Sequence, residues 1–177
     1  TLWTNVLIGR NGGLERRTLI NREGMQKYLR DSFARNKPYD RMVQELVTAT
    51  GSTTPGQGDF NGATNFLVGK LEENAAQATA MTAKIFLGLQ VQCTQCHNHP
   101  FNDWKQDSFW GFNAFFRQTR AVRMGERRER DARLVDQDFA GEDNNPSQAA
   151  IFYELRNGLL KVSYPTFVDG TAIDPNG

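Results

Sequence analysis

Cysteine is scarce in this chain: its 177 residues include only two, Cys93 and Cys96, and both lie in one pentapeptide. A domain held together by several disulfides is therefore excluded. Long apolar runs are missing too, because none approaches the roughly 18 residues that a membrane-spanning helix needs. The composition thus excludes a transmembrane segment, while the length is sufficient to bury a core without disulfide support.

A dominant charge of either sign is also missing. Lysine and arginine total 21 against 20 aspartate and glutamate residues, so the formal net charge is +1. This balance gives no reason to expect nucleic acid or a charged membrane surface as the main partner. Aromatic residues are plentiful, with 12 Phe, 3 Trp and 4 Tyr, whereas a disordered chain carries few. We therefore expect a folded domain with an aromatic core and no nucleic-acid partner.

Neither end of the sequence carries a recognisable targeting segment. The chain begins at Thr1 without the basic and apolar stretches of a signal peptide, and residues 174–177 resemble a linker. We interpret the chain as a mature exported protein or as part of a longer chain or assembly.

Apolar residues recur at helical spacing in the first two thirds of the chain. Asn21 is the expected N-cap of the first of these helices, and Gly51 the expected stop of the second. The glycine-rich stretch 51–65 predicts a loop, and its spacing does not match a phosphate-binding motif. The sequence predicts helices over residues 21–36, 39–50, 72–89 and 103–118.

The character of the sequence changes after residue 118. Residues 119–146 carry many arginine, glutamate and aspartate residues and few apolar ones, which is typical of a solvated arm or a long hairpin. A docking surface for an acidic partner is the alternative. Residues 158–168 alternate enough to predict a short strand that ends near Pro165.

The pentapeptide from Cys93 to His97 has the form Cys-x-x-Cys-His. Two thiols at this spacing reach the two vinyl groups of one haem edge, and the following histidine presents its imidazole to the iron. The motif therefore predicts one covalent haem c, with Cys93 and Cys96 as the attachment points and His97 as the proximal ligand. Histidine in this position is a standard proximal ligand.

The neighbouring residues fit an apolar haem slot, which excludes water and tunes the iron. Phe86 precedes the motif, and Phe101 and Trp104 follow it, so we expect these three side chains to contact the cofactor. Met81, on the helix that leads into the motif, is the candidate distal ligand. One alternative is an open sixth position, which would suit small-molecule binding or peroxidatic chemistry, and another is a ligand from a neighbouring chain.

Two other kinds of site use the same residue types. Cys93, Cys96, His97 and His99 are all possible zinc ligands, although zinc sites usually separate two ligand pairs by a dozen or more residues. A thioredoxin-like dithiol is the other alternative, but no βαβ pattern surrounds the motif. If the motif binds zinc, the chain is a non-redox structural or interaction domain.

The run from Phe86 to Phe101 resembles a family of large secreted proteins abundant in planctomycete bacteria, catalogued as domain of unknown function fifteen-forty-nine. Further similarity covers most of residues 2–118, including the stretches 36–40, 46–52 and 104–116. The resemblance implies a cytochrome-c-like module in an exported protein, often joined to other cytochrome domains. The family has no established activity, so the resemblance supplies context and no reaction.

These observations together predict a mainly α fold: a small cytochrome-c-like helical domain with an irregular C-terminal extension that contains short β segments. We expect a helical haem-binding domain over 1–118 and a charged extension or linker over 119–177. The expected function is electron transfer by one covalent haem, in the periplasm or at the cell surface. The expected partner is a redox protein or a neighbouring cytochrome domain. Nothing in the sequence indicates a catalytic base beside a nucleophile, so an electron carrier is favoured over an enzyme.

Overall fold

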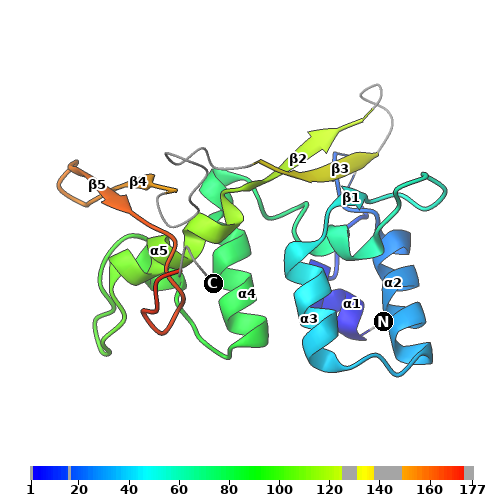
Figure 1. Ribbon diagram of the computed structural model, residues 1–177, viewed down its shortest axis with the longest axis horizontal. Coiled ribbons are helices and arrows are strands. Elements are labelled where there is room, and N and C mark those ends of the chain that lie inside the picture. Colours follow the sequence, from blue (N-terminus) through cyan, green and yellow to red (C-terminus); the bar gives the residue numbers. More distant parts are fainter. Residues whose placement is uncertain (1, 16, 125–130, 138–148, 174–177) are drawn as a thin grey trace. The chain divides into compact units, whose positions relative to one another are not determined.

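A computed structural model of the chain describes residues 2–15, 17–124, 131–137 and 149–173 (Figure 1). The chain forms two compact units, and each combines segments that are distant in the sequence. Unit 1 contains residues 1–72 and 119–136, and unit 2 contains residues 73–118 and 137–177. The helices predicted within 1–118 are thus shared between the two units. The predicted charged arm falls partly on residues 125–130 and 138–146, outside the described residues.

Unit 1 packs helices against a small sheet. Its described elements are α1 (Leu2–Ile8), α2 (Arg22–Ala34), α3 (Tyr39–Thr48), β1 (Gly51–Ser52), the 3-10 helix η1 (Gly62–Phe66), β2 (Thr119–Arg123) and β3 (Ala132–Asp136). The predicted cap is confirmed, since the Asn21 side chain accepts a hydrogen bond from the Gly24 backbone N–H at 2.9 Å. The core side chains come from the helices and from β3, among them Leu7, Met25, Leu46, Phe66 and Leu134.

Two glycines allow α2 to lie close to neighbouring backbone segments of unit 1, at η1 and at Thr53. A Cβ on Gly62 would lie 2.4 Å from the Gly24 carbonyl oxygen, and a Cβ on Gly24 would lie 2.4 Å from the Thr53 carbonyl oxygen. These contacts are with backbone atoms, which cannot move aside as the end of a side chain can. Close approach of backbone to backbone therefore requires glycine at both positions.

A buried lysine ties α1 to η1 in unit 1. The ammonium group of Lys70 donates a hydrogen bond to the Leu7 carbonyl oxygen at 2.9 Å and another to the Phe66 carbonyl, and it lies 4.4 Å from the centre of the Phe66 ring. Burial lowers the pKa of Lys70 to about 8.

The stability of the chain should consequently rise between pH 8 and pH 10. The folded state binds this proton less tightly than the unfolded state, so deprotonation favours folding by up to about 2 kcal/mol across that interval. Denaturant unfolding at several pH values measures how steeply the free energy of unfolding rises with pH, and Lys70→Met should make this rise smaller. A wild-type slope no steeper than that of the variant would contradict the prediction.

Unit 2 is built around two packed helices. Its described elements are a 3-10 turn η2 (Glu73–Ala75), α4 (Ala76–Phe86), the 3-10 helix η3 (Gln92–Gln95), α5 (Gln106–Phe116), β4 (Ile151–Glu154) and β5 (Leu160–Ser163). Alanines on α4 allow the aromatic face of α5 to approach closely, and strand β4 closes this core. The buried cluster comprises Ala76, Ala80, Ala83, Val91, Phe109, Trp110, Ala114, Ile151 and Tyr153.

The chain enters α4 through a left-handed turn, so the predicted helix starts later than residue 72. Glu73, Asn74 and Ala75 have φ angles of 51°, 62° and 57°, values that cost energy for residues other than glycine. Asn113 on α5 holds the turn, because its side-chain amide donates to the Asn74 carbonyl oxygen and to Thr79 Oγ1, both at 2.9 Å. Gly88, with φ 70°, follows the end of the helix.

The mainly α, cytochrome-c-like fold class is wrong, because the fold is mixed. Strands β1, β3 and β2 form an antiparallel sheet in that order, and β4 pairs with β5 in a second antiparallel sheet. The segment expected to be a loop contains β1, which pairs with β3 in the register Gly51 to Leu134. The hairpin interpretation is confirmed for β2 and β3, and the strand expected within 158–168 is β5.

Candidate functional site

The Cys-x-x-Cys-His segment lies between α4 and α5 in unit 2, on η3 and the residues that follow it. Thr94 is fully buried, and its hydroxyl donates to the Val91 carbonyl oxygen at 2.6 Å. This anchor turns the two flanking thiols outward, and Cys93, Cys96 and His97 are all exposed. Both cysteines are free thiols. The local fold thus presents the reactive atoms of the motif at the surface.

Side chains of α5 hold the backbone of the motif in place. The Gln95 carbonyl oxygen accepts hydrogen bonds from Gln106 Nε2 and from Trp110 Nε1, each at 3.1 Å. The Gln106 backbone N–H donates to Asn98 Oδ1 at 3.0 Å. Trp110 in turn stacks on Tyr153 of β4, with ring centres 5.5 Å apart. The position of the motif therefore depends on α5 and, through Trp110, on β4.

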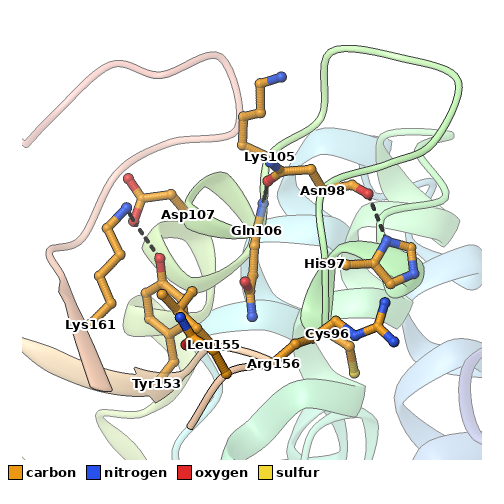
Figure 2. A pocket seen from close by; sticks show the side chains of 11 residues that line it. Cys96, His97, Asn98, Lys105, Gln106, Asp107, Tyr153, Leu155, Arg156 and Lys161 are labelled. Atoms are coloured by element: carbon orange, nitrogen blue, oxygen red, sulfur yellow. Dashed lines mark hydrogen bonds and ion pairs between the residues drawn. The ribbon is translucent and has the colours of Figure 1, made fainter. Parts of the chain in front are cut away.

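The hydrogen bond of His97 determines which ring nitrogen is available to a ligand. His97 Nδ1 lies 2.6 Å from the Asn98 carbonyl oxygen (Figure 2). A carbonyl only accepts, so Nδ1 must carry the proton and donate it. The neutral ring then leaves the lone pair of Nε2 free. This is the tautomer that metal-ligating histidines commonly adopt when a backbone carbonyl orients them.

His99 has the opposite arrangement. Its Nδ1 accepts a hydrogen bond from the Phe101 backbone N–H at 3.2 Å, so the neutral ring carries its proton on Nε2. Its own backbone N–H donates to the Trp104 carbonyl oxygen at 2.8 Å. His99 therefore stabilises the turn after the motif, while His97 presents a free lone pair.

A hollow of about 700 Å³, here called the Cys96 hollow, opens beside Cys96 and His97 (Figure 2). Its volume is in the range of small-molecule and cofactor sites. The side of this hollow across from the motif is formed by the β4–β5 hairpin, through Tyr153, Leu155, Arg156, Asn157 and Lys161. A second hollow of about 490 Å³, here called the Leu160 groove, also reaches Cys96 and includes Trp110, Phe152 and Leu160.

The charges in the Cys96 hollow are only partly compensated. Asp107 accepts a hydrogen bond from the Tyr153 hydroxyl at 3.0 Å and forms an ion pair with Lys161 at 3.4 Å. Burial raises the pKa of Tyr153, and the neighbouring Asp107 carboxylate adds to the effect. Lys105 and Arg156 have no acidic partner among the described residues. The hollow consequently carries a surplus of positive charge.

The other predicted site residues lie away from these two hollows. Phe86 and Met81 are half-buried on α4, and Trp104 is half-buried against the unit 2 core. Phe101 is 92% exposed. None of the four lines the Cys96 hollow or the Leu160 groove. The aromatic residues that do fill the core of unit 2 are Phe109 and Trp110 of α5 and Tyr153 of β4, and Phe109 is 2% exposed.

A family model described as PSCyt2, a protein of unknown function (DUF1549), matches residues 1–121. The chain belongs to this family. The PSCyt2 match contains the whole Cys-x-x-Cys-His motif and ends within β2, so the β4–β5 hairpin lies outside it. No curated protein and no solved structure matches the chain. No helix among the described residues is long and apolar enough to cross a membrane.

The zinc alternative for this PSCyt2 chain needs four ligand atoms around one point. Among the described residues, no three histidine, cysteine, aspartate or glutamate side chains lie together as a metal-binding group. His99 is held by the turn, as described above. The four candidate ligands thus do not converge on a common point, as tetrahedral zinc would require.

Sequence reasoning missed the residues of the β4–β5 hairpin that line both hollows. They lie more than 50 positions after the motif, and no local pattern links the two segments. One available signal is that Ile151, Phe152 and Tyr153 are consecutive apolar residues, so the strand must present an apolar side chain on each face. The structure buries Ile151 and Tyr153 and exposes Phe152.

Proposed function

We propose that unit 2 carries one covalently attached haem c and serves electron transfer in an exported protein. The observation that supports this most directly is the arrangement of the motif. Two exposed thiols flank the buried Thr94. The Nδ1–H of His97 donates a hydrogen bond to the Asn98 carbonyl oxygen, which leaves the Nε2 lone pair free. Thioether attachment and axial ligation to iron need this set of donors.

The residues present fit the cofactor by their chemistry. The Cys93 and Cys96 thiols would each add across a vinyl group, with sulfur bonding to one carbon and the thiol hydrogen passing to the other, so that no oxidant is consumed. His97 would ligate the iron through Nε2. When bound, the haem would supply a one-electron redox change, and the protein would supply binding, orientation and charge.

Electron transfer is favoured over catalysis because of the exposure of the site. An attachment edge at the surface allows another redox centre to approach closely, as transfer between proteins requires. We therefore propose a redox protein or a neighbouring cytochrome domain as the partner. Because thioether attachment of haem takes place outside the cytoplasm, we propose a periplasmic or cell-surface location, which fractionation of native cells would check.

The decisive experiment is to export the full chain in a host with c-type cytochrome maturation machinery. The denatured protein should then keep its haem through acid–acetone extraction and give a pyridine haemochrome spectrum typical of two thioether bonds. We expect about one haem per chain, because one motif provides one attachment site. Purified protein without covalent haem, from a host that matures a control cytochrome, would refute the proposal.

A further inference from the structure

The C-terminal hairpin of unit 2 offers an apolar surface beside the motif. In the register of β4 and β5, Phe152 lies opposite Val162, and Glu154 lies opposite Leu160. Since Ile151 and Tyr153 are buried in the core, these partners lie on the outward face of the hairpin. Phe152 is 64% exposed and Leu160 is 72% exposed.

Two of these exposed side chains adjoin a thiol of the motif. Phe152 and Leu160 line the Leu160 groove together with Cys96. Burying these side chains would be favourable, because each Å² of apolar surface removed from water contributes about 25 cal/mol. A planar apolar ligand attached through Cys96 would remove part of that surface from water.

The same hairpin places beside the motif a cation, Arg156, that forms no ion pair with another described residue. Arg156 lines both the Cys96 hollow and the Leu160 groove, and Figure 2 shows its side chain extending toward Cys96 and His97. Lys161 is paired with Asp107, and Figure 2 shows the Lys105 side chain directed away from the motif. Arg156 is therefore the cation of this hollow best placed to act on a group bound at His97.

We propose that the β4–β5 hairpin is the second wall of the haem site, with Phe152 and Leu160 contacting the macrocycle and Arg156 supplying positive charge near the iron. This inference rests on the function proposed above. It extends the site beyond residues 1–121, the part that matches the family model. A cation at this position favours the reduced iron, which carries less positive charge, and so raises the reduction potential.

The apolar contacts are tested by haemin titration of the full chain in a Cys93→Ser/Cys96→Ser background, where binding through His97 is reversible. Adding Leu160→Ser should weaken haemin binding by roughly tenfold, because a macrocycle contact is lost. Leu159→Ser is the matched control, since Leu159 is 61% exposed and lines neither hollow. Equal haemin affinities of the two variants would overturn the apolar contact.

The same pair of substitutions is also compared in the wild-type motif, in case the double serine variant binds no haemin. There, the thermal midpoint of the holoprotein should exceed that of the apoprotein by less in Leu160→Ser than in the wild type. Leu159→Ser should leave this difference unchanged. The apoprotein midpoints of both variants should match, since both side chains are at the surface. Equal gains for the two holoproteins would again contradict the contact.

The charge is tested by redox titration of the covalent holoprotein. Arg156→Gln should lower the reduction potential, Arg156→Lys should restore it, and the difference should shrink at high ionic strength because salt screens exposed charges. Arg120→Gln, on β2 in unit 1, is the control. Equal potentials for wild type and Arg156→Gln would overturn this role. Absence of covalent haem in the wild type would refute the proposed function itself, and the inference with it.

Discussion

We expect the replacement of both Cys93 and Cys96 by serine to abolish the proposed covalent haem attachment, from about one haem per chain to none detectable on a denaturing gel. Serine keeps the size and polarity of the side chain, but its hydroxyl is far less nucleophilic than a thiol. Because both side chains are exposed, the substitutions remove no packing from the core. The fold, followed by circular dichroism, should therefore be unchanged.

The single variants sharpen this prediction. Cys93→Ser and Cys96→Ser should each leave one thioether, and the pyridine haemochrome band should move toward that of haem with one free vinyl group. Covalent haem that persists in the double variant would show that attachment occurs elsewhere. Loss of the fold in the double variant, in contrast, would assign the thiols a structural role.

We expect the replacement of His97 by alanine to leave the proposed haem attached through the thioethers while changing its absorption spectrum in both oxidation states. Nε2 of His97 is the nitrogen of the motif with a free lone pair, so the substitution removes the expected proximal ligand of the iron. The holoprotein should also lose thermal stability, because the ligand bond that joins haem to the chain is gone. Absorption spectroscopy and thermal unfolding measure the two effects.

His99→Ala is the matched control for that experiment. It removes an imidazole two residues away whose Nδ1 accepts the Phe101 N–H, so it should loosen the turn and leave the iron spectrum unchanged. Met81→Ala in the same series tests the distal ligand that the sequence analysis expected. A change in the spectrum of the reduced protein would support that assignment, while an unchanged spectrum would favour an open sixth position. An unchanged spectrum in His97→Ala would contradict the haem proposal as a whole.

Local signals in the sequence predicted α2 to α5, but not the short helix α1. The helix expected over 21–36 is α2, with Asn21 as its cap, and the helix expected over 39–50 is α3. Helices are predictable in this way because their hydrogen bonds and apolar faces involve residues three or four positions apart. The helix over 72–89 was predicted too long at its start, because the left-handed turn at Asn74 is held by Asn113, 39 residues further along the chain.

The pairing of strand β1 in the three-stranded sheet was not predictable from local sequence patterns. Strand β1 has only two residues, and it pairs with β3, whose Leu134 lies opposite Gly51. Such a pairing depends on segments brought together by the rest of the fold, so a short strand in a glycine-rich stretch has no local signature. The mainly α expectation followed from this missing information.

The sequence by itself determined the chemistry of this protein: the two thiols, the histidine that follows them, the helices on either side, and membership of a family through residues 1–121. Only the tertiary structure decided how that chemistry is presented. The tautomer of His97 depends on one carbonyl, the placement of the motif on Trp110 of α5, and the wall opposite it on a hairpin more than 50 residues away. Spacing along the chain encodes which groups are near neighbours, but contacts between distant segments exist only once the core has packed.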